Sequence, residues 1–290
     1  MNTGYIKLSH FSVKEYLLST RVEEYFRIDE KTSHSKISEL SIAYLLQFDD
    51  DSLPLSVAML DSMPLAQYAA RSWIDHAKLG GVDPSVLRLI LCLFTSESAP
   101  LKNWIQIHNI DAEGYENLSM HEGQVGSALY YSSLAGMQEV SDCLLHRGEN
   151  ANAEGGRLGN ALQAASYEGY EAIVKLLLEN GAEVNAEGGD YRSALQAASF
   201  RGDETIVKLL LKNGAKVDAE GGIYGSALQA AAGLFEGNVV IVKLLLENGA
   251  KVNARGGKYG NALQAASFRG HEAIVKLLLK NRAQVNAKGG

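Results

Sequence analysis

The chain has 290 residues, 46% of them hydrophobic, and a formal net charge of −7. This composition is that of a folded globular protein and excludes a disordered chain, and the lack of a basic surplus disfavours general nucleic-acid binding. The longest apolar runs are far too short to span a membrane, and the N-terminus carries no secretory signal.

Apolar spacing predicts five helical segments in the first 120 residues. They are expected at 10–19, at 33–48, from Pro64 to Ile74, at 84–94, and around Trp104 and Ile105. Ser12, with Glu15 three residues later, has the spacing of a capping box at the start of the first segment. The large aromatic residues of this region are expected to fill a core, and nothing in it indicates a catalytic site.

The composition changes near 105–120, and we place a domain boundary there, because all four prolines and both tryptophans lie before residue 105. The two cysteines, Cys92 and Cys143, have no partners at metal-ligand spacing. We expect both to be buried reduced thiols, as is usual in an intracellular protein. The predicted location is the cytoplasm, with the nucleus left open.

A sequence unit recurs through the rest of the chain. The strings SALYYSS, GNALQAAS, SALQAAS, SALQAAA and GNALQAAS follow one another, and the leucine of each marks the period. These leucines are Leu129, Leu162, Leu195, Leu228 and Leu263, which lie 33, 33, 33 and 35 residues apart. A fixed period of this length indicates a repeat array. We assign five units, at 122–154, 155–187, 188–220, 221–255 and 256–290.

Each unit is expected to hold a short helix, a glycine turn, a longer helix and a tight β-turn finger. The predicted N-caps of the short helices are Ser127, Asn160, Ser193, Ser226 and Asn261. The glycines expected to end them are Gly136, Gly169, Gly202, Gly237 and Gly270. Glutamates at 171, 204 and 272 favour the start of the longer helix. Two extra residues within 233–236 should lengthen the turn of the fourth unit. The fifth unit lacks a polar capping pattern, so this end of the array is expected to be truncated or to fray.

This order of elements at a 33-residue period resembles the ankyrin repeat. The string GxExIVKLLLxxGAxVNA matches that family closely, whereas (N/S)ALQ stands where the family usually has TPLH. The resemblance implies a mainly α fold, an ankyrin-repeat α-solenoid of helix–turn–helix units with β-turn fingers, over 121–290. It also implies that a concave face binds other proteins.

Four stretches before the repeats resemble the segment that follows the NTPase module in fungal NACHT–ankyrin proteins, which are NLR-like signal-transducing ATPases. They are KLSHFSVKEYL at 7–17, SIAYLLQF at 41–48, PLAQYAARSWIDHA at 64–77 and NWIQIHNID at 103–111. The resemblance implies a winged-helix-like segment at 1–50 and a helical connector at 51–120. The phosphate loop of an ATPase is absent from this sequence, so no ATPase function is carried over.

Positions that differ between copies, on the fingers and at the ends of the short helices, are free to specify a partner. Tyr, Phe and Arg, the types that dominate interface hot spots, are frequent there. The candidate partner-binding residues are Arg157, Tyr167, Glu168, Asp190, Tyr191, Arg192, Phe200, Arg201, Tyr224, Leu234, Phe235, Lys258, Tyr259, Phe268 and Arg269. An alternative left open is that Tyr191, Tyr224 and Tyr259 only brace adjacent fingers.

Catalytic and metal sites are not indicated by the sequence. His271 and Glu272 begin like a zinc-protease helix, but Val275 stands where the second histidine is needed, and the seven histidines are scattered. We therefore expect no enzyme, cofactor or metal, and no nucleic-acid, membrane or small-molecule partner. The predicted function is a protein-interaction scaffold. The alternative is a sensor or regulatory fragment of an NLR-like ATPase whose NTPase domain is absent from this chain.

Overall fold

The computed structural model describes residues 29–48, 63–95, 99–111, 125–234 and 237–287. The chain divides into two compact units, 1–108 and 109–290. The described residues hold fourteen α-helices and, outside them, only isolated β-bridges. The fold is therefore mainly α, as predicted.

The first unit contains four described helices: α2 (Glu30–Leu45), α4 (Ala66–Gly80), α5 (Pro84–Leu93) and α6 (Ala99–Ile107). They confirm four of the five predicted segments. The carboxylates of Asp29 and Asp83 cap the starts of α2 and α5. The fifth prediction, a helix at 10–19, and most of the winged-helix-like segment lie outside the described residues.

The core of the first unit is built from three large rings that exclude water completely. Trp104 lies 5.2 Å from Trp73 and 5.6 Å from Phe94 between ring centroids, and all three are 0% exposed. The indole nitrogen of Trp104 also donates to the carbonyl of Ala70 at 3.0 Å. The predicted aromatic core is confirmed. One expectation is wrong, because Cys92 is exposed on α5 and Cys143 is only half-buried.

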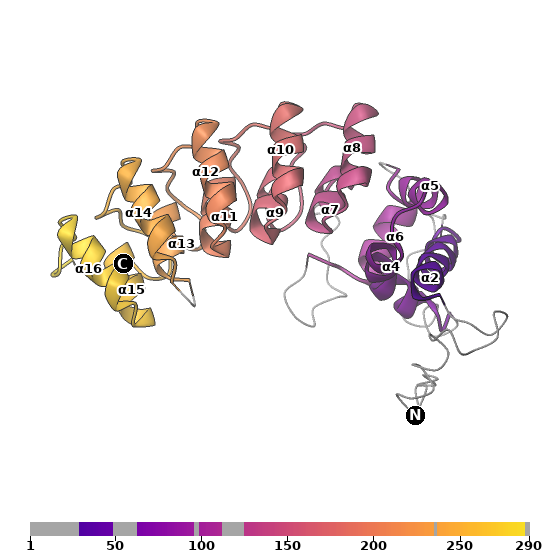
Figure 1. Cartoon of the computed structure of the whole chain (residues 1–290), viewed down its shortest axis with the longest axis horizontal. Helices are drawn as coiled ribbons and strands as arrows, with labels where there is room; N and C mark the ends of the chain where they lie inside the picture. Colours follow the sequence, from indigo (N-terminus) through magenta and orange to yellow (C-terminus); the bar gives the residue numbers. More distant parts are fainter. Residues whose placement is uncertain (1–28, 49–62, 96–98, 112–124, 235–236, 288–290) are drawn as a thin grey trace, which may run out of the picture. The chain divides into compact units, whose positions relative to one another are not determined.

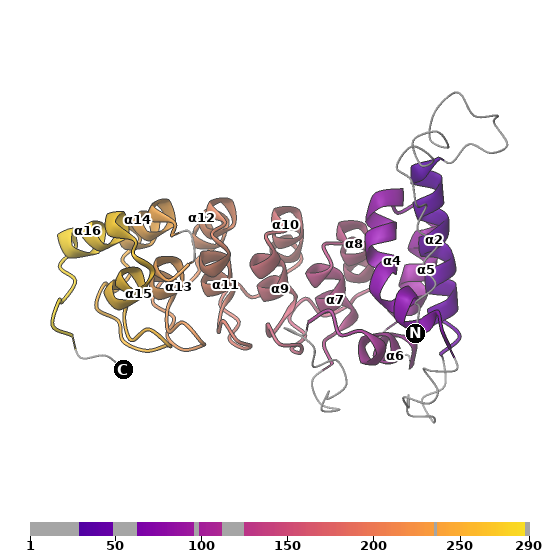
Figure 2. The ribbon, with the colours of Figure 1, turned by 90° about the horizontal axis from the view of Figure 1, so that it is seen from below.

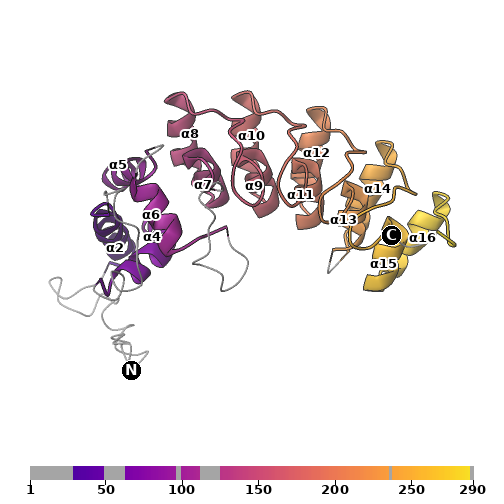
Figure 3. The ribbon, with the colours of Figure 1, turned by 180° about the vertical axis from the view of Figure 1, so that it is seen from behind.

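The second unit is a stack of helix pairs. The first helices are α7 (Ala128–Leu134), α9 (Ala161–Glu168), α11 (Ala194–Arg201), α13 (Ala227–Ala232) and α15 (Ala262–Arg269). The second helices are α8 (Gln138–His146), α10 (Glu171–Glu179), α12 (Glu204–Lys212), α14 (Val239–Glu247) and α16 (Glu272–Lys280). They form two rows, and the first helices lie on the inner side of the bend of this unit (Figure 1, and from behind in Figure 3).

The first helix of each repeat unit begins with the predicted N-cap. The side chains of Ser127, Asn160, Ser193, Ser226 and Asn261 all accept a hydrogen bond from the backbone amide three residues on. In the last four repeat units buried alanines fill the contact between neighbouring first helices, and each second helix buries a stripe of aliphatic side chains, such as Ile206, Val207 and Leu210 of α12. Fingers, defined as residues 154–160, 188–192, 221–225 and 256–260, are each closed by one β-bridge.

One of the five predicted helix-ending glycines is wrong. Gly169, Gly202 and Gly270 are left-handed C-caps, and Gly136, also left-handed with a φ of 70°, directly follows Ala135, the C-cap of α7. In the fourth unit α13 ends earlier, and its C-cap is Gly233 rather than Gly237. The first helix of that unit is thus shorter and its turn longer, as the two extra residues predict.

Successive units are tied by one amide side chain at a fixed place. Asn185 donates to the carbonyl of Gly214 at 3.0 Å and accepts from the amide of Lys216 at 2.7 Å. Asn152 and Asn253 make the same two bonds to the units that follow them. The fourth equivalent is Asp218, which accepts from the amide of Lys251 but has no amide protons to donate.

Candidate functional site

Six aromatic side chains form a continuous set along the repeats, which we call the aromatic ladder. The fingers contribute Tyr191, Tyr224 and Tyr259, and the first helices contribute Tyr167, Phe200 and Phe268. Neighbouring ring centroids lie 4.7 to 6.2 Å apart, a spacing at which rings attract one another. Phe200 contacts both Tyr191 and Tyr224, so that one helix ring bridges two successive fingers.

The exposure of the aromatic ladder is greatest at its C-terminal end. Tyr191 and Tyr224 are 4% and 6% exposed, so these two rings brace the fingers and offer little surface to a partner. Tyr167, Phe200 and Tyr259 are half-buried. Phe268 is 73% exposed, although α15 has the same sequence, ALQAASFR, as α11. The accessible end of the ladder is therefore formed by Tyr259 and Phe268.

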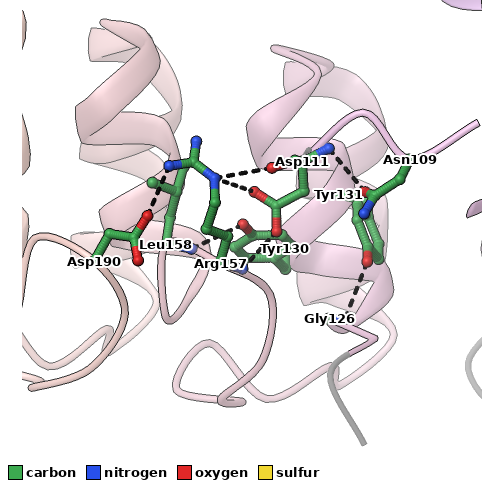
Figure 4. A network of polar contacts seen from close by, with 8 residues as sticks. All are labelled: Asn109, Asp111, Gly126, Tyr130, Tyr131, Arg157, Leu158 and Asp190. Atoms are coloured by element: carbon green, nitrogen blue, oxygen red, sulfur yellow. Dashed lines mark hydrogen bonds and ion pairs between the residues drawn. The ribbon is translucent and has the colours of Figure 1, made fainter. Parts of the chain in front are cut away.

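Arg157 is engaged in a network at the other end of the array (Figure 4). Its Nη1 donates to Oδ2 of Asp190 and its Nε donates to the carbonyl of Asp111, both at 2.9 Å. The Asp111 carboxylate, 5% exposed, also accepts the backbone amide of Arg157. Burial raises the pKa of the Asp111 carboxyl, while the bond from the Arg157 amide and the guanidinium charge oppose that rise.

The same network reaches two buried tyrosines of α7 (Figure 4). The hydroxyl of Tyr130 accepts the amide of Leu158, and the hydroxyl of Tyr131 accepts the amide of Gly126, both at 3.2 Å. Burial raises the pKa of Tyr131 to about 12, so its hydroxyl stays protonated. Arg157 and Asp190, two of the candidate partner-binding residues, thus hold the first fingers together.

The remaining candidates are dispersed. Arg192 pairs with Glu187, the residue just before its finger, and has a positive φ of 68°. Glu168 and Leu234 are half-buried, and Arg201 is exposed. Phe235 lies outside the described residues.

Two cations lie on the accessible end of the aromatic ladder. The Lys258 ammonium sits 4.4 Å from the centroid of Tyr224 and 5.1 Å from that of Tyr259, and it donates to the Tyr224 hydroxyl at 3.1 Å. Arg269 donates to the hydroxyl of Tyr259 at 3.1 Å and to the carbonyl of Gly233 at 3.0 Å. Cations over ring faces are attracted by the ring quadrupole.

The charged state of Lys258 is favoured at this position. Burial lowers the pKa of Lys258, but the hydrogen bond to Tyr224 and the two tyrosine hydroxyls outweigh that effect, and the net pKa is raised. Lys258, Tyr259, Gln264 and Phe268 line an open depression with a volume of about 520 Å³. Gln264 is absent from the sequence-based candidates because it is the same in every full copy and was assigned to packing.

Other features of the described residues give weaker indications of a functional site. An apolar depression of about 450 Å³ lies on α2 and α4, lined by residues such as Leu40, Tyr44 and Leu65. The described part of the chain contains no cluster of three or more His, Cys, Asp or Glu residues arranged to hold a metal ion. None of the described helices is long and apolar enough to cross a membrane.

Comparison with known proteins gives two matches. A family model described as ankyrin repeats, in three copies, matches residues 129–221 and 194–289. A curated relative from Monascus ruber, "Azaphilone pigments biosynthesis cluster protein L", is 34% identical over 153 residues. That alignment covers 49% of this chain and 32% of the relative, so the chain matches only about a third of the relative's length.

Proposed function

Because the chain belongs to the ankyrin-repeat family, whose repeats are generally protein-interaction modules, we propose that it is a non-catalytic scaffold that binds a partner protein through the concave side of its array. The first helices line the inner side of the bend seen in Figure 1, and Figure 2 shows them from below as one of the two rows of helices. The observation that carries the proposal is Phe268, a large ring of the first helix α15 that is left 73% exposed and lines a depression. Exposed aromatic and basic residues together are typical of interface hot spots.

A comparison of three forms of the full chain tests this proposal. The wild type, Phe268→Ala and Val240→Ala are used as baits for quantitative affinity capture from the source cells. Val240 is a matched control because it is 50% exposed on α14, in the other row of helices. We expect a set of proteins retained by wild type and Val240→Ala and depleted with Phe268→Ala, at unchanged thermal stability. Equal recovery by all three baits would contradict binding at this surface.

Catalysis is not part of the proposed function, since the ankyrin-repeat fold is typically non-catalytic. A titration of the chain with ATP, followed by calorimetry, is expected to give no heat of binding. Measurable affinity for ATP would argue for an enzymatic role instead.

A second role is that of the sensor segment of a longer NLR-like ATPase. The observation in its favour is that the curated relative is longer than this chain and shares only part of its length with it. In this role the repeats bind a ligand and the first unit transmits that event to an NTPase module. A reading frame upstream that encodes a phosphate loop would favour this role over a free-standing scaffold.

A further inference from the structure

The helix side of the aromatic ladder is interrupted in the fourth unit. The seventh residue of the first helix is Tyr167, Phe200 and Phe268 in three units, but the corresponding position after α13 is Gly233. A Cβ added to Gly233 would lie 2.8 Å from an edge carbon of Tyr259, so a side chain there would collide with that ring. Gly233 therefore allows Tyr259 to lie close against the backbone.

Next to this interruption, where the other units have a ring, lies the ammonium group of Lys258. Phe200 contacts the ring of Tyr224 from the N-terminal side, and the Lys258 ammonium lies over Tyr224 and Tyr259 together. Of the three donors of that ammonium, one is used on the Tyr224 hydroxyl. The exposed position of Lys258 leaves room for acceptors from outside the chain.

The charges at the two ends of the array are compensated differently. Arg157 faces the carboxylates of Asp111 and Asp190. Within the described residues, Lys258 forms no ion pair with a carboxylate, and its recorded contacts are with tyrosines. An acidic group from a partner would give Lys258 the opposite charge that Asp190 gives Arg157.

We propose that the depression lined by Lys258, Tyr259, Gln264 and Phe268 binds a segment of the partner protein in which an Asp or Glu neighbours an apolar side chain. The carboxylate accepts hydrogen bonds from Lys258, and the apolar side chain covers the exposed ring of Phe268. Charge-assisted bonds of this kind are shorter and stronger than neutral ones. The inference rests on the proposed function, and specifies the chemistry that the scaffold recognises.

Selection from a random peptide library displayed on phage, with the immobilised full chain as target, tests the inference. We expect the enriched peptides to carry an acidic residue next to an apolar one. For such a peptide, Lys258→Gln should weaken binding by about tenfold to a hundredfold, and Lys258→Arg should retain most of the affinity. Replacing the acidic residue of the peptide by its amide should weaken binding to wild type equally, and should have no further effect on Lys258→Gln.

The control is Lys243→Gln, which removes the same charge from an exposed site on α14. Peptides that are lost with Phe268→Ala but keep their affinity for Lys258→Gln would overturn the acidic preference and leave the scaffold function standing. Enriched peptides that bind all variants equally would count against both. Affinity for an oligonucleotide that depends on Lys258 would also overturn the inference, because the partner would then be a nucleic acid. Unchanged melting of each variant excludes unfolding as the cause.

Discussion

The side-chain amide of Gln163, on α9, donates a hydrogen bond to the carbonyl of Gly188, in the finger of the next unit, at 3.0 Å. Gln229 bridges to the following finger in the same way, and Gln196 donates to the carbonyl of Ala219, two residues before the next finger. These glutamines stand at the end of the (N/S)ALQ motif that departs from the usual family pattern. The glutamine that replaces the usual histidine of the motif therefore links a first helix to the next finger or to the residues just before it.

Gln163→Ala should lower the free energy of unfolding by about 1–3 kcal/mol, because it removes two hydrogen bonds to part-buried carbonyl oxygens of the next finger. The carbonyls concerned are those of Gly188 and Arg192. Gln264→Ala is the matched control, since Gln264 makes only one such bond, at 3.5 Å. Urea denaturation followed by circular dichroism measures both variants. An equal loss in the two would show that finger bonding is not the cause.

Asp218→Asn should stabilise the array by about 1 kcal/mol, because it restores the amide donor that Asn185 provides in the preceding unit. The substitution removes the ion pair between Asp218 and Lys251, whose atoms are 3.7 Å apart, and an exposed pair of this kind contributes little. The reverse change, Asn185→Asp, should destabilise the array. If both variants shift the denaturation midpoint in the same direction, the role assigned to the amide is wrong.

Arg157→Ala should destabilise the C-terminal compact unit, residues 109–290, by about 3 kcal/mol. The reason is that the Asp111 carboxylate stays buried without its cation. The folded-state pKa of Asp111 is raised above its ordinary 3.8, so its ionised form costs stability as the pH rises through the folded pKa. Removing Arg157 should raise this pKa further. Acidification should therefore recover part of the loss, and so should adding Asp111→Asn. A loss that is independent of pH would contradict the explanation.

His76 should make the N-terminal compact unit, residues 1–108, less stable in mild acid. Its Nδ1 lies 2.6 Å from Nδ1 of His34, and its Nε2 lies 2.9 Å from the hydroxyl of Tyr68. Burial and the neighbouring His34 lower the folded pKa of His76 below 6.5, so stability is complete above 6.5 and falls as the pH drops through the folded pKa. Both tryptophans lie in this unit, and their fluorescence in denaturant therefore reports on it alone.

His76→Gln should remove this pH dependence. His146→Gln serves as the control, because His146 is exposed in the second unit. Should the midpoint of tryptophan fluorescence stay constant between neutral and mildly acidic pH in the wild type, the histidine contact has no such effect.

Amide hydrogen exchange should be faster at 272–282 than at 205–212. The helix α16 buries Ile274 and Leu278, whereas α12 buries Ile206, Val207 and Leu210. Fewer buried apolar contacts lower the local free energy of opening. Equal protection in the two segments, measured by mass spectrometry, would show that the fifth unit is as stable as the third.

The repeat period was enough to predict the helices of the array, their caps and the longer turn of the fourth unit. The exposure of individual side chains could not be predicted from the repeated sequence motifs. The helices α11 and α15 have identical sequences, and yet Phe268 is exposed far more than Phe200. The pairing of Arg157 with Asp111 depends on residues 46 positions apart and leaves no local pattern. The inter-unit amides were overlooked because residues that recur in every copy were all attributed to packing.

The identity of α11 and α15 also bears on how such an array changes during evolution. Phe200 is half-buried and the ring of Tyr224, from the finger that follows, contacts it, so the exposure of such a ring depends on the neighbouring unit as well as on its own sequence. Duplication of one unit behind Phe268 would bury that ring and expose its copy one step further along. Unit duplication would therefore change which ring is exposed without changing its chemistry, and new specificity would have to come from finger residues such as Lys258.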